Sequence, residues 1–224
     1  MTTHLLQSTG VRGGAATGSG PQRRAPGFTL VELLTVIAIV GLLVAILIPT
    51  MGGARNSARR AETRIRFSQW ANALEQFRQD YGYYPAVTTD GLLNPSAFLG
   101  ALTARDHLGA PVPDDRLAGN TRRALFHSVS EAEFVKDAAG AAVNELADAF
   151  GNSDIVILVD ADGNGVIQGA ELVRKPVRPG NSQAGYGAAL TPAAEDFPAA
   201  GIRAGVILYS AGPGGGADFV YSWK

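Results

Sequence analysis

The feature that most constrains this chain of 224 residues is an apolar run over residues 28–48, which ends at Pro49. An α-helix of roughly twenty apolar residues is long enough to cross the ~30 Å hydrocarbon core of a bilayer. The run contains one charged side chain, Glu32, about one helical turn from its start. A charge in lipid costs on the order of 2 to 3 kcal/mol or more near the helix centre and normally has a partner. The run therefore predicts a membrane helix in which the Glu32 carboxylate needs a specific partner.

The residues around Glu32 resemble the processing site of type IV pilins and type II secretion pseudopilins. The resemblance rests on a basic pair at residues 23–24, on Gly27, and on the sequence Phe-Thr-Leu-Val-Glu at residues 28–32. In that family a prepilin peptidase removes a basic leader after the glycine, and the new N-terminal residue is methylated on its amine. The resemblance implies cleavage between Gly27 and Phe28 and N-methylation of Phe28.

The same resemblance assigns Glu32 and Pro49 to assembly. Glu32 becomes the fifth residue of the mature chain, where the family pairs this carboxylate with the N-terminal amine of a neighbouring subunit as a filament grows. Pro49 corresponds to the family's helix-kinking proline. The implied partners are further copies of the chain in a homo-oligomeric filament, other pseudopilins, the prepilin peptidase and an inner-membrane assembly platform. The implied location is the inner membrane, with a cytoplasmic leader and a periplasmic head, before assembly into a periplasmic or extracellular filament.

Three other interpretations of the N-terminal segment exist. A simple single-pass anchor explains the apolar run and its positive flank, but it has no use for Glu32. A secretory signal peptide has an apolar core of only about 7 to 15 residues and a small-residue cleavage site. A twin-arginine export signal is compatible with residues 23–24, whereas the length of the apolar run and its acidic residue argue against it.

Composition divides the chain into four parts. The leader, residues 1–27, carries three arginines and no acid and is rich in Gly, Ser, Ala and Thr, so that it cannot form a core. Residues 28–49 form the transmembrane and assembly helix, and residues 50–84 its amphipathic continuation. Residues 85–224 are enough for one globular head with a real core.

Charge and cysteine content narrow the choice of partners. The formal net charge of −1 becomes more negative once the leader is removed, so that no nucleic-acid partner is expected. The chain contains no cysteine, and an exported domain without disulfides depends on packing, oligomerisation or a metal.

The continuation of the helix carries an apolar stripe. Large apolar side chains recur at intervals of three and four residues: Phe67, Trp70, Leu74, Phe77 and Tyr81. This period predicts a helix that packs on the head through one side, and Gly82 is expected to end it. A cluster of arginines over residues 55–78 indicates a solvated face near anionic headgroups or, alternatively, a patch for a specific partner. Together with the strands expected in the head, this predicts an α+β, pilin-like fold in which a long N-terminal helix packs on a small antiparallel β-sheet.

A second motif follows an apolar, β-branched run at residues 155–159, which predicts a buried strand. The residues that follow have the spacing of an EF-hand calcium loop, with a glycine at the sixth position. The candidate ligands are the side chains of Asp160, Asp162, Asn164 and Glu171 and the backbone carbonyl of Val166. The flanks are not helical, however. Two interpretations stay open: a Ca²⁺ site, or a plain hairpin turn in which Asp, Asn and Gly serve turn geometry.

Near the C-terminus, two further strands are expected at residues 205–210 and 217–223, joined by a glycine-rich loop. This ending resembles the major pseudopilin, in which acidic residues of the loop bind calcium. Here the loop retains Asp218 alone, which puts that particular site in doubt.

An enzyme is not expected, because the three histidines are isolated and no catalytic motif is present. The sequence predicts a structural subunit of a type II secretion pseudopilus or of a type IV pilus-like filament. The alternative is a membrane-tethered calcium- or ligand-binding module that does not polymerise. Residues 95–145 look like an insertion relative to a minimal pseudopilin, where a subunit-specific surface is expected.

Overall fold

The structure is a computed structural model that describes residues 27–213 and 218–224. The chain divides into two compact units, Met1–Ile48 and Pro49–Lys224. The leader, residues 1–26, lies outside the described residues, and so does the side chain of Pro49. Among the described residues, no helix combines the length and the apolar character that crossing a membrane requires.

The predicted α+β class is confirmed. The longest element is α1 (Leu30–Tyr81), whose second part belongs to the larger unit. The helix ends where the sequence predicts: Gly82 adopts the left-handed conformation with φ 80°, and its N–H donates to the carbonyl of Arg78 at 2.7 Å. A glycine adopts this conformation without the steric cost that a Cβ brings, and it is therefore a natural helix stop.

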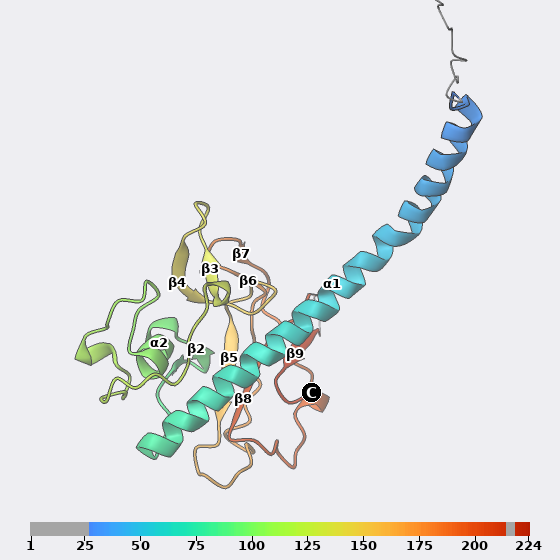
Figure 1. The fold of residues 1–224 in the computed structure, drawn as a ribbon. Coiled ribbons are helices and arrows are strands. Elements are labelled where there is room, and N and C mark those ends of the chain that lie inside the picture. The colour runs from blue at the N-terminus through green and yellow to red at the C-terminus, as the bar shows by residue number, and fades with distance from the viewer. Residues whose placement is uncertain (1–26, 214–217) are drawn as a thin grey trace, which may run out of the picture. The chain divides into compact units, whose positions relative to one another are not determined.

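The head is built on an antiparallel sheet in the order β1-β2-β5-β8-β9 (Figure 1). Its strands are β1 (Thr88–Thr89), β2 (Leu92–Leu93), β5 (Ile155–Val159), β8 (Val206–Ala211) and β9 (Phe219–Tyr221). The longest pairing joins β5 to β8, with Ile157 opposite Leu208. β5 pairs with β2 on its other side, through Leu92 and Val156. β5 and β8 are therefore the central strands, and both are buried along nearly their whole length.

One face of the sheet receives the helices. The stripe on α1 is buried as predicted, since Phe67, Trp70, Leu74 and Phe77 have no exposed surface and pack in one cluster with β5 and β8. The second helix, α2 (Pro95–Thr103), joins this cluster, and its Phe98 ring lies 5.0 Å from that of Trp70, centre to centre. α2 begins with Asn94 as N-cap, because its side-chain oxygen accepts a hydrogen bond from the Ala97 N–H at 3.1 Å.

The opposite face is covered by the segment between β5 and β8, residues 160–205, which we call the excursion. Alternate residues of the central strands, among them Val156, Ile207 and Tyr209, pack with Phe197 and Trp223. The excursion contains the short ribbon β6 (Gly180–Asn181) and β7 (Gly185–Tyr186) and the turn η3 (Ala194–Asp196). Cover on both faces explains why residues 155–159 are continuously apolar and not alternating.

The region that we interpret from the sequence as an insertion, residues 95–145, contains little regular structure beyond α2. It comprises the single turns η1 (Asp114–Arg116) and η2 (Glu131–Glu133) and the ribbon β3 (Phe134–Lys136) with β4 (Ala142–Leu146). Ser130 and Glu133 form a capping box. It opens only one 3₁₀ turn, because the chain becomes extended at Phe134 and begins β3.

The hairpin considered for the Asp160 loop is wrong. The chain after β5 does not return along β5, because both edges of that strand are already occupied by β2 and β8. Ile167 instead forms an isolated bridge with Ile202. The loop is therefore not a hairpin turn but the start of the segment that packs on one face of the sheet.

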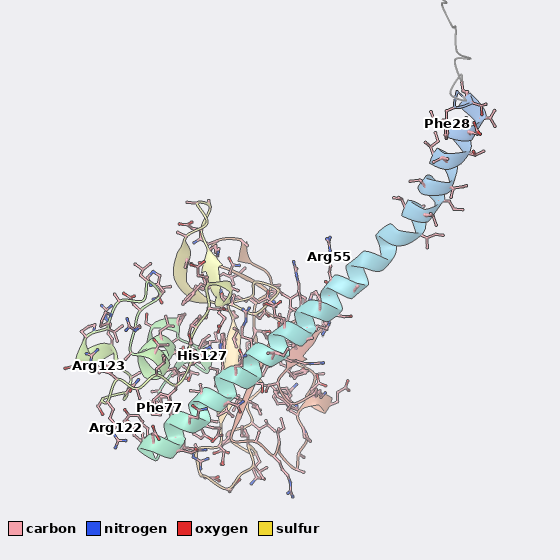
Figure 2. All side chains as sticks on the ribbon, viewed as in Figure 1. Phe28, Arg55, Phe77, Arg122, Arg123 and His127 are labelled. Atoms are coloured by element: carbon pink, nitrogen blue, oxygen red, sulfur yellow. The ribbon has the colours of Figure 1, made fainter. Side chains whose placement is uncertain are left out.

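Replacing Phe77 (Figure 2) with alanine should lower the free energy of unfolding by about 3 to 5 kcal/mol, because the ring is fully buried and its loss leaves a cavity. Ile65→Ala on the same helix is the matched control. Ile65 is 60% exposed, so that its replacement should change stability by less than about 0.5 kcal/mol. Urea unfolding of the chain in detergent, followed by far-UV circular dichroism, measures both. Equal losses for the two variants would contradict this assignment of the buried face.

Candidate functional site

The first candidate site is the start of α1. Thr29 and Glu32 cap the helix reciprocally: the Thr29 N–H and hydroxyl both donate to Glu32 Oε2 at 2.8 Å, and the Glu32 N–H donates to Thr29 Oγ1 at 3.2 Å. This is a capping box, which satisfies N–H groups that the first turn of a helix leaves without a partner. The single charge of the apolar run thus has a structural role within its own chain.

The other oxygen of that carboxylate has a different environment. Glu32 is exposed, and its Oε1 has no hydrogen-bond partner among the residues that the structure describes. A carboxylate oxygen accepts a strong hydrogen bond from a charged donor such as an amine. The arrangement leaves Oε1 accessible to a donor from another molecule while Oε2 holds the cap.

The apolar surface that follows is open to solvent. The large apolar side chains of residues 30–46 are about half exposed or more; Leu30 at the start is 79% exposed and Ile46 at the end is 63% exposed. Phe28, just before the helix, is 75% exposed. Figure 2 shows these side chains projecting on both sides of the ribbon, with Phe28 at its start. Monomeric soluble proteins rarely leave an apolar surface of this extent uncovered, so the segment is a candidate interaction surface.

Comparison with known proteins places this segment in a family. Residues 22–48 match the family model described as the prokaryotic N-terminal methylation motif. The type II secretion system core protein G of Aeromonas hydrophila is 34% identical over 71 residues, which are 32% of this chain and 49% of the relative. The type IV wide pilus major component PilA4 of Thermus thermophilus is 39% identical over 62 residues, which are 28% of this chain and 47% of the relative. The N-terminal part of the chain is thus similar to the corresponding parts of pilins and pseudopilins.

The likeness is confined to part of each protein. The chain spans about half the length of the curated relatives it matches, and the match to core protein G of Klebsiella pneumoniae, 32% identical over 85 residues, covers 38% of this chain. No solved structure matches the chain. The greater part of the head is therefore interpreted from its own residues.

The second candidate site of this pilin-like chain is the loop after β5. Asp160 is almost fully buried, and it accepts hydrogen bonds from the N–H groups of Gly163, Asn164 and Gly165 at 2.8 to 3.1 Å. Burial by itself raises the pKa of Asp160, but the hydrogen bonds, first among them that of Gly165, outweigh it and hold the pKa below its ordinary value. The side chain is therefore an ionised carboxylate that organises the loop.

The structure brings Glu171 back to this loop. Glu171 Oε1 accepts hydrogen bonds from the N–H groups of Ala161 and Asp162, at 2.7 and 3.1 Å. One carboxylate oxygen from each of Asp160, Asp162 and Glu171 lies within 4.8 Å of the others. Three acids that are spread over twelve positions in the sequence thus meet at one point.

The other two predicted ligands lie at the rim of the loop. The Asn164 side chain donates to Asp162 Oδ2 at 2.7 Å and accepts from the Val166 N–H at 2.8 Å. Asn164 therefore bonds to a member of the acidic cluster, and Val166 is tied to Asn164.

Several arginines of α1 bind the head instead of facing solvent. Arg60 forms an ion pair with Asp218, and the buried Arg66 donates to the Ala147 carbonyl. Arg78 donates to the hydroxyl of Tyr84 at 3.1 Å. The sequence did not separate these three from the exposed Arg55 and Arg64, because the distinction depends on contacts with residues distant along the chain.

A further polar cluster, centred on Glu133, joins the region of residues 95–145 to α1. Its carboxylate accepts hydrogen bonds from the Trp70 indole N–H at 2.6 Å and the Ser130 N–H at 2.8 Å, and it lies 3.0 Å from His127 Nε2. Burial raises the pKa of Glu133, but the hydrogen bonds from His127, Ser130 and Trp70 together outweigh it and hold the pKa below its ordinary value. The capping-box sequence signals the bond to Ser130, whereas no local pattern signals the contact with Trp70.

The stability of the head should decrease as the pH falls, in part because of Glu133. A carboxylate whose pKa is lower in the folded than in the unfolded chain stabilises the fold above its unfolded pKa, and this contribution is lost as the pH falls through the folded pKa. Unfolding free energies between pH 7 and about pH 3.5 should therefore fall less steeply in Glu133→Gln than in the wild type. Glu131→Gln is the matched control, since Glu131 lies in the same turn with its side chain 89% exposed. Identical pH slopes for wild type and Glu133→Gln would refute the role of this carboxylate.

Proposed function

We propose that this chain is a structural subunit of a type II secretion pseudopilus or of a type IV pilus-like filament, and that it is made as a precursor. The observation that carries the proposal is the register of the N-terminal segment. The prepilin-type motif covers residues 22–48, and Gly27, where we propose that the leader ends, lies two residues before the Thr29–Glu32 capping box that opens an exposed apolar helix. The motif, the charge of Glu32 and the apolar surface therefore lie together in one segment, which supports the proposal.

The case for cleavage after Gly27 includes a steric argument. A Cβ built on Gly27 meets no atom of the described residues within 4 Å, so these residues do not require a glycine there. Recognition by a prepilin peptidase supplies a reason for glycine at this position. Phe28, which becomes the mature N-terminus, is 75% exposed and accessible to a methylating enzyme.

The case for assembly rests on the exposed segment. Full burial of each Leu, Ile or Val side chain yields about 1.5 to 3 kcal/mol, and residues 28–46 contain many such side chains in exposed positions. We propose that lipid covers this surface while the subunit is held as a single-pass protein in the inner membrane, with the head in the periplasm. Neighbouring subunits then replace the lipid when the filament grows, in contact with other pseudopilins and an inner-membrane assembly platform.

Glu32 supplies the specificity of that step. Its Oε2 accepts hydrogen bonds from Thr29, whereas Oε1 is accessible. The carboxylate can therefore cap its own helix and at the same time accept a hydrogen bond from the Phe28 amine of a neighbouring subunit. In an apolar surrounding, an ion pair without one of its partners is strongly unfavourable. The pairing would therefore select subunits in the correct register.

Processing is tested by expressing the full chain with a prepilin peptidase and measuring its mass. The expected product begins at Phe28 and carries one added methyl group. Gly27→Val should stay uncut, while Gly41→Ala, another open glycine position in this segment, should be processed normally. An uncut wild-type chain, or a mature N-terminus near Ala54, would reject the proposal.

Assembly is tested in a host that carries a matching assembly system. Glu32→Ala should enter the membrane fraction but be absent from sheared filaments. Glu32→Gln should also be impaired, because glutamine can still accept the hydrogen bonds of Thr29 but lacks the charge. Glu62→Gln is the control, since Glu62 lies farther along α1 and pairs with Arg66 of its own chain. Wild-type filament yield from Glu32→Ala would instead favour the alternative, a membrane-tethered module that does not polymerise.

A further inference from the structure

We propose that the loop over residues 160–171 is a calcium site formed by the carboxylates of Asp160, Asp162 and Glu171. This binding site lies in the head and goes beyond the filament function proposed above. Asn164 and the Val166 carbonyl, at the fifth and seventh positions of the loop, would supply further oxygens. Three carboxylates with oxygens within 4.8 Å of one another form the core of the site.

The decisive atom is Glu171 Oε2. It is buried, and it has no hydrogen-bond partner among the described residues, whereas Oε1 of the same carboxylate accepts two N–H groups of the loop. A buried carboxylate oxygen without a partner is unfavourable, because it has lost water and gained nothing in exchange. A cation held between the three acids would provide the missing partner.

The position of Glu171 also fits the chemistry of calcium. Ca²⁺ takes six to eight oxygen ligands, and in loops of this spacing the acid at the twelfth position binds through both of its oxygens. Glu171 stands at the twelfth position counted from Asp160. No helix follows the loop here, yet the chain returns Glu171 to the first residues of the loop. The sequence shows only that Asp160, Asp162 and Glu171 have the spacing of a calcium loop, whereas the structure brings their carboxylates together.

The ligand set argues for calcium over other metals. All of the side chains are hard oxygen donors, whereas zinc sites use cysteine and histidine. No cysteine occurs in the chain, and the metal-competent cluster found among the described residues contains no histidine. Magnesium demands a near-ideal octahedron and usually keeps several waters, which suits three converging protein carboxylates less well.

Arg78 is the competing counter-charge. Its Nη2 lies 3.0 Å from a Cβ built on Gly163, and its charge acts on Asp160. The same guanidinium, however, donates to the Tyr84 hydroxyl, lies over the Tyr84 ring and approaches Glu75 at 3.9 Å. One guanidinium with these other partners does not balance three acids, which leaves room for a divalent cation.

A cation here would hold together two parts of the head. Asp160 directly follows β5, and its N–H donates to the Gly205 carbonyl just before β8. Beyond the loop, Ile167 pairs with Ile202 on the covered face of the sheet. Binding would therefore fix the start of the excursion that covers that face, in a chain that has no disulfide to do so.

The test is thermal unfolding of the full chain in detergent, in EGTA, in CaCl₂ and in MgCl₂ at equal concentration, with calorimetric titration of CaCl₂. Calcium should bind at one ion per chain and raise the Tm by on the order of 5 to 10 °C at a hundredfold excess over Kd. Magnesium should give a much smaller shift. Glu171→Gln and Asp162→Asn should each reduce the calcium shift by more than half while leaving the Tm in EGTA nearly unchanged.

Asp137→Asn is the matched control. Asp137 also accepts two N–H groups of its own turn, those of Ala139 and Ala141, but it belongs to no acidic cluster among the described residues. This variant should keep the full calcium shift. An unchanged Tm at millimolar calcium would overturn the proposal and leave Arg78 as the counter-charge of the loop. A full shift that survives in Glu171→Gln would overturn it as well, because the ion would then bind elsewhere.

Discussion

The burial of one stripe of α1 against the central strands is the interaction on which the rest of the head depends. Phe67, Trp70, Leu74 and Phe77 are fully buried and share a cluster with β5, β8 and α2. The same helix carries exposed Ala58 and Ile65 closer to its N-terminus. The helix thus has one stripe that is covered within its own chain and, over residues 30–46, an apolar surface that is exposed.

Polar contacts set the register of the helix on the head. Arg60 pairs with Asp218, Arg66 bonds to the Ala147 carbonyl, and Trp70 bonds to Glu133. Apolar packing alone tolerates small shifts along the helix, whereas buried charged groups lose much free energy when a partner is removed. The Arg60–Asp218 pair is of special interest, because Asp218 is the one acid retained in a loop that resembles a calcium-binding loop of the family. The positive charge beside Asp218 is the guanidinium of Arg60, which belongs to α1.

The excursion between β5 and β8 gives the sheet a second apolar core, on the face opposite the one that packs against α1. It covers the face opposite α1, where Phe197 packs edge-on against Tyr209 and Trp223. The Asp160 loop begins this excursion, so its geometry influences the cover of the whole second face. Side-chain bonds also tie this segment to the rest of the head, among them the ion pair of Arg178 with Asp154 and the hydrogen bonds of Ser182 and Tyr186 to Glu145.

The sequence by itself determined the features that depend on near neighbours. The stripe over residues 67–81, the helix stop at Gly82 and the buried strand at 155–159 follow from period and backbone preference. Only the tertiary structure decided which arginines bind the head, that Trp70 meets Glu133, and that β5 lies between β2 and β8 instead of forming a hairpin. It also returned Glu171 to Asp160. These outcomes rest on contacts between residues far apart in the chain, whose free energy depends on the packing of the whole head and leaves no local pattern to be read.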